Sequence, residues 1–439
     1  MFTSIYLHNY KTFTDTTIDL SLNNKVKNLV LLYGENGAGK SNFASVFFCF
    51  AELIRTMDVR DIFQELMGKH QETANMEDLM SILKSRFRDV EAIIKEAKTI
   101  GAEGNIILDF SFIINNKRGR YLIEMGETEI VHERLEYVLE KNKGVYFDII
   151  PGKTKLNEKV FLNTSIQNDI TENIKRFWGK HSLLAIIHHE FIDKSRKFLE
   201  DAFSEHFRNC LNDFYLLSCR IRKPESPQYE YLGLRNKMLS QLSFGSIGNE
   251  DIKDIDKIEK MLNLFLPSIN SSIKEVFYKK KKKDKIISYR LYTKQFISGK
   301  LVDIPFSLES TGTHNILELL PFFLNVVRGY TVVIDEFDSG IHDLLVKYII
   351  EDIVNEYNGQ IIITTHNTLV MSSDIIPSSS FYTIENDKEG NRKIESITDS
   401  SDERVHPNHN KQSRYIDGKY KAIPDKIHIA IKELDAILD

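Results

Sequence analysis

Short apolar runs alternate with helically spaced segments in the first fifty residues and in the last third of the chain. The runs Leu29–Tyr33, Thr331–Asp335 and Gln360–Thr365 have apolar centres, which is typical of strands buried on both faces. Segments with helical spacing accompany them at 43–53, 316–327 and 344–357. Strands that alternate with helices of this length indicate a parallel α/β sheet.

The middle of the chain has two other patterns. Residues 106–113, 120–124 and 145–150 are rich in β-branched and aromatic side chains and are separated by polar turns, which predicts antiparallel strands. Residues 60–100 and about 168–280 combine helical spacing with many charges, which predicts helices with solvated faces.

Composition narrows the class of protein. The chain has 439 residues, 42% of them hydrophobic, which is enough for two or three domain cores and excludes a wholly disordered chain. Its net charge of −5 excludes a uniformly basic nucleic-acid binder. We expect a cytoplasmic protein without a membrane partner, because the sequence has neither a signal peptide nor an uncharged apolar stretch of about 18 residues. The cysteines Cys49, Cys210 and Cys219 have no paired spacing, so we expect reduced thiols.

A glycine-rich turn directly follows the run Leu29–Tyr33. It is Gly34-Glu35-Asn36-Gly37-Ala38-Gly39-Lys40-Ser41, which fits the pattern G-x-x-x-x-G-K-[ST] between a buried strand and a helix. Glycines let successive backbone N–H groups point towards phosphates, and the following helix adds the positive end of its dipole. We expect this loop and Asn42 to bind ATP, with Lys40 on the β- and γ-phosphates and Ser41 on Mg²⁺.

Two acids, Asp335 and Glu336, end the second apolar run. Ligands bind at the carboxyl ends of strands in open α/β sheets, so both carboxylates should lie near the nucleotide. In a chain that also has a phosphate-binding loop, an apolar strand that ends in two acids matches a Walker B motif. We expect Asp335 to hold Mg²⁺ through its water shell and Glu336 to polarise the attacking water.

Two further polar clusters adjoin apolar segments. His366 ends the third run and could contact the γ-phosphate, although a polar residue with an ordinary structural role at a strand end is the alternative. Ser310-Thr311-Gly312-Thr313 precedes a helix, where small hydroxyls and glycine form either an anion site or an ordinary helix cap.

The order of these motifs resembles that of a known family. The chain is similar to the ABC-type ATPase heads of SMC proteins and RecF-like repair ATPases, and more closely to bacterial abortive-infection ATPases of the AbiL and "overcoming lysogenization defect" type. The matching segments are the opening strand Ile5–Phe13, the degenerate signature motif Ser310–Thr313, the D-loop segment Phe337–His342 and the C-terminal tail Arg414–Tyr420. The usual Leu-Ser-Gly-Gly form of the signature is absent.

The resemblance implies an α/β fold, an ABC-type head with a mixed, mainly parallel sheet. Its expected parts are a first ATPase lobe with the phosphate-binding loop and antiparallel strands (1–165), a helical insertion for interaction (166–285), and a second lobe with the signature, Walker B motif, D-loop and switch histidine (286–439).

The resemblance also implies a mechanism. ATP bound to the loop of one subunit is completed by the signature turn of another, so that Ser310 and Gly312 act in trans within a homodimer or larger oligomer. The expected reaction is slow hydrolysis of ATP to ADP and phosphate, in which Lys40, His366 and Glu336 serve the chemistry. We expect a sensor or scaffold in antiphage defence that controls a separately encoded nuclease or toxin.

Two other functions stay open. One is a RecF-like ATPase of DNA repair or recombination, and the other is an assembly that ATP stabilises, with incidental hydrolysis. The run Lys279–Lys283 bears on this choice, because it could track the phosphate backbone of DNA. The alternative is the solvated end of a hairpin or helix.

Overall fold

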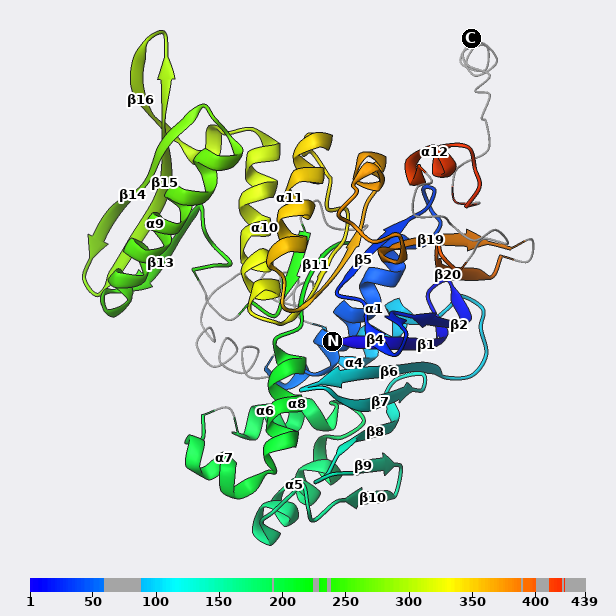
Figure 1. Cartoon of the computed structure of the whole chain (residues 1–439). Coiled ribbons are helices and arrows are strands. Elements are labelled where there is room, and N and C mark those ends of the chain that lie inside the picture. Colours follow the sequence, from blue (N-terminus) through cyan, green and yellow to red (C-terminus); the bar gives the residue numbers. More distant parts are fainter. Residues whose placement is uncertain are drawn as a thin grey trace, which may run out of the picture.

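The computed structural model describes residues 1–58, 88–191, 193–223, 229–234, 238–387, 390–399, 410–420 and 422. Within these ranges the chain forms two seven-stranded sheets and a separate four-stranded sheet (Figure 1). Most of the helical prediction for 60–100 lies outside the described residues. Its described end contains α4 (Val90–Ala97).

The central sheet carries the predicted motifs. Its strand order is β12 (Tyr229–Leu232), β11 (Ser218–Arg222), β17 (Thr331–Ile334), β18 (Gln360–Thr364), β5 (Leu29–Tyr33), β19 (Phe381–Asn386) and β20 (Arg392–Ser396). The strands from β11 to β19 are parallel, and both edge strands are antiparallel to their neighbours. Every residue of β5, β17 and β18 is buried, as their apolar runs predict.

The second sheet is antiparallel. Its strand order is β10 (Lys153–Leu156), β9 (Lys143–Ile150), β8 (Ile130–Val138), β7 (Lys117–Met125), β6 (Ile106–Ile114), β1 (Phe2–Tyr10) and β2 (Phe13–Asp19). The three strands predicted between 106 and 150 are confirmed as β6, β7 and β9, whereas β8 was not predicted. The short strands β3 (Ser21–Leu22) and β4 (Lys25–Val26) form a hairpin before β5.

Helix α1 (Lys40–Leu53) is packed between the two large sheets. Its Phe47 and Phe50 rings lie 5.3 and 5.0 Å from Phe2 and Phe110 of the antiparallel sheet, and its other side contacts β11 and β18. The opposite face of the central sheet is covered by α10 (Thr311–Val327) and α11 (Asp343–Glu356) (Figure 1). This layering places the beginnings of α1, α10 and α11 at the carboxyl edge of the parallel strands.

Five further helices lie beside these sheets in the described residues, and most of their buried side chains belong to the hydrophobic cores of the sheets. They are α5 (Thr164–Phe177), α6 (Leu183–Phe191), α7 (Arg196–Ala202), α8 (Glu205–Tyr215) and α12 (Lys411–Ile416). Among the helices of the described residues, none combines the length and apolar character needed to cross a bilayer.

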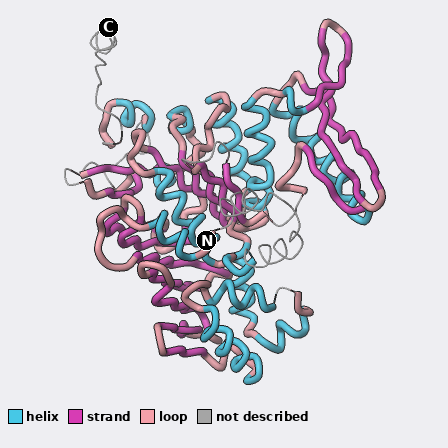
Figure 2. The backbone as a smooth tube through the Cα atoms, turned by 180° about the vertical axis from the view of Figure 1, so that it is seen from behind, coloured by secondary structure: helices cyan, strands magenta, loops and turns pink. Residues whose placement is uncertain are grey.

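The four-stranded sheet projects from the part of the chain that holds the two large sheets, and we call it the arm (Figure 2). It consists of β13 (Phe244–Gly248), β14 (Ile273–Lys283), β15 (Ile286–Ile297) and β16 (Lys300–Pro305), with α9 (Ile252–Ile269) packed on one face.

The prediction that residues 168–280 are helical is wrong over much of that range. Strand β11 lies inside the central sheet, paired with the Walker B strand β17, and β12, β13 and β14 are strands as well. These strands form because long-range partners pair with short, charge-rich segments, which helical spacing cannot reveal. The segment 166–285 is therefore not one helical insertion, and its boundaries stay predictions.

Candidate nucleotide-binding site

The predicted phosphate-binding loop joins the carboxyl end of β5 to the beginning of α1. Gly37 and Gly39 have φ angles of 79° and 113°, in the region that favours glycine. Gly39 caps α1 without a side-chain hydrogen bond, so the N–H groups of the first turn are available to an anion. Asn36 and Gly37 are exposed at the tip of the loop, whereas Gly34 and Ala38 are buried at its base.

Lys40 is folded back over this loop. Its Nζ donates to the backbone oxygens of Gly34 at 2.8 Å and Glu35 at 2.9 Å, and only 7% of the residue is exposed. Burial lowers the pKa of Lys40, and the carboxylates of Asp335 and Asp338 oppose that shift. The ammonium group therefore lies between the loop and the Walker B acids, where phosphate oxygens could replace the two carbonyls.

Asp335 is fully buried at the end of β17. Its Oδ1 accepts a hydrogen bond of 2.6 Å from the Thr364 hydroxyl, whereas its Oδ2 has no hydrogen-bond partner among the described residues. Burial raises the pKa of Asp335, and the nearby Thr364 and Ser41 hydroxyls oppose the shift. An unpartnered carboxylate oxygen beside a hydroxyl fits Mg²⁺, which prefers oxygen ligands. Ser41 and Asp335 would hold the ion, which would supply positive charge for the phosphate oxygens.

Glu336 has a strained backbone and a defined side-chain environment. Its φ of 48° lies in the left-handed region, which costs a non-glycine residue about 1–2 kcal/mol. Its backbone N–H donates to the Thr364 hydroxyl at 2.9 Å. Its Oε2 lies 3.1 Å from Arg222 Nη1 and 3.4 Å from the Tyr229 hydroxyl. The turn thus presents the Glu336 carboxylate beside a cation at the nucleotide edge of the sheet.

His366 follows β18 at the same edge. Its backbone N–H donates to Asp338 Oδ2 at 3.0 Å, and the side chain is exposed. Partial desolvation and the nearby Lys40 charge lower the pKa of His366, while Asp338 and Glu336 oppose the shift. A neutral imidazole near Lys40 can exchange hydrogen bonds with a phosphate or a water at neutral pH.

The signature turn Ser310–Thr313 begins α10. Ser310 Oγ accepts from the Thr313 N–H at 3.2 Å, so this residue is the helix cap that the conservative interpretation expects. Gly312 faces the D-loop segment, since a Cβ there would lie 2.6 Å from the Gly340 oxygen. Within the described residues, no hydrogen bond or ion pair joins Ser310 or Gly312 to the phosphate-binding loop, so their action in trans stays a prediction.

Asn42 has a structural contact. Its side-chain amide donates to the Thr12 hydroxyl at 2.8 Å, which ties α1 to the turn between β1 and β2. A direct role of Asn42 at the nucleotide stays a prediction.

The geometry therefore brings Lys40, Ser41, Asp335, Glu336 and His366 to one edge of the sheet. A family model described as "AAA domain, putative AbiEii toxin, Type IV TA system" matches residues 29–372, a range that contains all five residues. The chain belongs to this AAA-domain family. None of the curated proteins compared with the chain matches it.

Solved SMC heads resemble this AAA-domain protein weakly. The SMC head domain from Thermotoga maritima aligns at 13% identity and a TM-score of 0.40, over 90% of this chain and 98% of that one. The SmcHead bound to the C-winged helix domain of ScpA aligns at 12% identity and a TM-score of 0.42, over 90% of this chain and 97% of that one. A third structure is the Smc head domain with an extended coiled coil bound to the C-terminal domain of ScpA, derived from Pyrococcus furiosus. It aligns at 12% identity and a TM-score of 0.39, over 90% of this chain and 96% of that one. Scores this low say nothing about what the chain binds.

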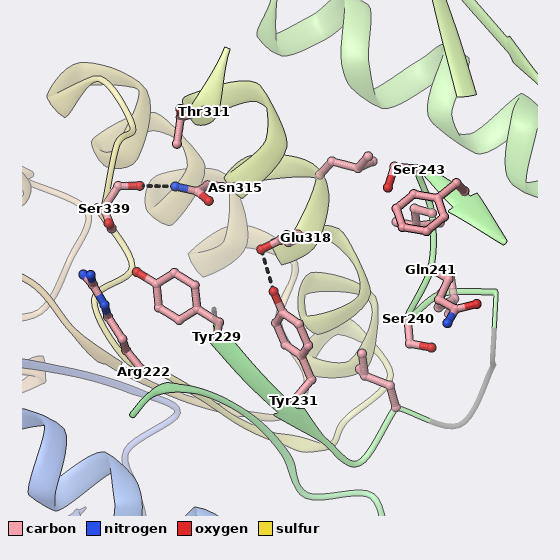
Figure 3. Close-up of a pocket in the computed structure, with 15 residues that line it drawn as sticks. Arg222, Tyr229, Tyr231, Ser240, Gln241, Ser243, Thr311, Asn315, Glu318 and Ser339 are labelled. Atoms are coloured by element: carbon pink, nitrogen blue, oxygen red, sulfur yellow. Dashed lines mark hydrogen bonds between the residues drawn. The ribbon is translucent and has the colours of Figure 1, made fainter. Parts of the chain in front are cut away.

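Sequence reasoning missed a cavity beside the acid pair of this AAA domain. The cavity has a volume of about 530 Å³ and lies between β12, the beginning of α10 and residues 239–244 (Figure 3). Arg222 and Tyr229, the partners of Glu336, line it together with Thr311 and Asn315 of the signature helix. The cavity therefore lies between the side chains that hold Glu336 and the turn that is predicted to meet a second subunit.

Arg220 is buried behind two residues that line the cavity, Tyr229 and Glu318. It is 1% exposed, and its guanidinium lies 3.3 Å from the Tyr229 ring centroid and 3.7 Å from the Glu318 carboxylate. Alternation of polar and apolar residues over 218–222 was the one sequence signal for this strand, and the surrounding charges obscured it.

Proposed function

We propose that the chain is an ATP hydrolase that acts as an ATP-driven sensor and scaffold in antiphage defence by abortive infection. In this proposal it controls a separately encoded effector such as a nuclease or toxin. The observation that carries the hydrolase assignment is the buried Asp335, whose unpartnered oxygen lies beside Ser41 and across from Lys40.

The chemistry would follow from these side chains. Phosphoryl transfer to water needs charge neutralisation and positioning of the nucleophile more than covalent assistance. Lys40 would neutralise the β- and γ-phosphates, and Ser41 and Asp335 would hold the Mg²⁺ that bridges them. Glu336 would accept a hydrogen bond from the attacking water, and His366 would contact the γ-phosphate or that water.

The defence role is supported by the family description, which names the AbiEii toxin of a type IV toxin–antitoxin system. ATP bound between the loop of one subunit and the Ser310–Gly312 turn of another would make association depend on nucleotide. Such a two-state element would let a bound trigger or effector bias the equilibrium.

Arg222→Ala is expected to lower kcat for ATP hydrolysis roughly fivefold with KM for ATP unchanged, because a half-exposed ion pair contributes at most about 1 kcal/mol. Arg222 acts as a positioning residue for Glu336, so Arg222→Lys should retain most of the rate. Steady-state kinetics check this, with Arg196→Ala as control, since Arg196 pairs with Glu200 on the exposed α7. A change in KM alone would contradict the positioning role.

The defence proposal is tested by a pull-down from the native host with neighbouring genes intact. The bait is the Glu336→Gln variant with ATP, and both protein and nucleic acid in the eluate are identified. A nuclease-like or toxin-like protein that co-elutes with ATP but not with ADP is the expected result. Nucleic acid without a protein partner would contradict the sensor role and favour the RecF-like alternative. An assembly that keeps its function in Glu336→Gln would favour the structural alternative.

A further inference from the structure

The arm has two unlike faces. Helix α9 covers one of them, where the buried side chains are Val276, Tyr278, Ile287, Tyr289 and Leu291. Because side chains alternate along a strand, the intervening residues of β14 and β15 point to the other face, away from α9. We call this second surface the outer arm face.

Strand register defines the residues of the outer arm face. Phe244, Arg290 and Lys279 are directly opposite one another across β13, β15 and β14, and the next row in one direction contains Ser246, Ser288 and Lys281. The row in the other direction contains Tyr292 and Phe277, followed by Lys294 and Glu275. The face therefore includes Phe244, Phe277, Tyr292, Ile286, Lys279, Lys281, Lys283, Arg290 and Lys294, with Ser246, Ser288, Glu275 and Asp303.

The aromatic rings of this face lie among cations. The Phe277 and Tyr292 rings stack with centroids 5.7 Å apart. Lys279 Nζ lies 4.1 Å from the Tyr292 centroid, and Lys294 Nζ lies 5.2 Å from that of Phe277. Phe244 is 68% exposed at the edge of the same row. Ring faces next to ammonium groups suit a ligand that has both flat bases and negative charge.

The charge of the face is strongly positive. Two carboxylates partly balance it, since Glu275 pairs with Lys294 at 2.7 Å and Asp303 lies 3.6 Å from Lys279. Lys281, Lys283 and Arg290 have no ion-pair partner among the described residues. The run Lys279–Lys283 is thus divided, because Lys280 points to the α9 side and pairs with Asp256 at 2.6 Å.

We propose that the outer arm face binds single-stranded nucleic acid, with phosphates on its cations and unstacked bases on its aromatic rings. This arrangement of aromatic and basic residues on an open sheet face matches how proteins bind single strands. Bases in a duplex are already stacked on each other and cannot stack on the aromatic rings of the face. A duplex would therefore gain only the electrostatic attraction between its phosphates and the basic side chains. The face lies on the arm. Of its residues, Phe244 also lines the cavity beside Arg222 and Tyr229, whereas its basic residues and the Phe277 and Tyr292 rings do not. The binding proposed for them therefore does not rest on the proposed ATPase activity.

The test is fluorescence anisotropy with the full chain and three labelled probes of one length: oligo(dT), oligo(U) and a DNA duplex. Two double variants remove equal charge from the same strand, Lys281→Ala with Lys283→Ala on the outer arm face and Lys280→Ala with Lys282→Ala on the α9 side. We expect the first pair to weaken single-strand binding by at least tenfold. The slope of log Kd against log[salt] should fall by about 1.4, because two phosphate contacts are lost. The second pair should change affinity by less than about twofold.

Tyr292→Leu tests the stacking component separately. We expect it to weaken single-strand binding about tenfold without changing the salt dependence, and to leave duplex binding unaltered. Oligo(dT) and oligo(U) results decide between DNA and RNA as the source of the single strand. Equal effects of the two lysine pairs, or a duplex bound as tightly as a single strand, would overturn the proposal. Absence of binding to all three probes would also overturn it.

Discussion

Lys40→Ala is expected to lower the affinity for ATP by at least about a hundredfold and to abolish hydrolysis. Lys40 Nζ is held by two loop carbonyls at 2.8 and 2.9 Å, facing the buried Asp335. Its loss removes the cation that would meet the β- and γ-phosphates, and charge-assisted contacts of this kind are the strong ones. Equilibrium binding of a fluorescent ATP analogue measures the change, and a hundredfold loss corresponds to about 2.7 kcal/mol.

Lys27→Ala is the matched control for this experiment. Lys27 is also 7% exposed, and its Nζ donates to the Tyr382 hydroxyl at 2.8 Å. Lys27 precedes β5, whereas the phosphate-binding loop follows it. The Lys27→Ala variant should be less stable than the unmodified chain, because it loses a buried, hydrogen-bonded side chain. It should retain ATP binding. If Lys40→Ala kept the affinity of the unmodified chain, the loop would not be a phosphate-binding loop.

Glu336→Gln is expected to keep ATP binding and to lower kcat by at least about a hundredfold. General-base assistance of this kind contributes typically 10²–10⁴-fold, and an amide cannot accept the proton of the attacking water. The substitution is nearly isosteric, so the strained turn at φ 48° and the contact with Tyr229 should survive. Phosphate release under single-turnover conditions separates this effect from slow product release.

Glu136→Gln provides the control, because Glu136 is also a carboxylate paired with an arginine, Arg134 at 2.8 Å, on the remote strand β8. It should hydrolyse ATP at the unmodified rate. Turnover by Glu336→Gln at that same rate would show that another group activates the water.

The strands that carry the motifs were predictable because each is short, apolar and buried on both faces. In β5, β17 and β18 every position is buried, so local sequence and tertiary environment agree. The glycines of the loop and the acids after β17 then follow at the strand ends, where an open α/β sheet binds its ligands.

Strand β11 could not be predicted in the same way. Its residues Ser218–Arg222 lie between the charged helix α8 and further polar sequence, and their pairing with β17 joins positions more than a hundred residues apart. The contact between Arg222 and Glu336 could therefore not be predicted from the sequence, since Arg222 reaches the site only through that pairing. Strands β13 and β14 of the arm were missed for a related reason, whereas the pattern over 286–292 predicts the strand found as β15. Alternation in β14 ends in a run of lysines, which by itself does not show that Lys280 and Lys281 lie on opposite faces.

The molar mass of the Glu336→Gln variant with and without Mg²⁺-ATP decides whether ATP joins two subunits. Light scattering after size exclusion measures it. We expect a particle of 50.9 kDa without nucleotide or with ADP, and a doubling or larger increase of the mass with ATP. Lys40→Ala should not respond to ATP. If the Glu336→Gln variant bound ATP and stayed at the mass of one chain, a second subunit would not complete the site.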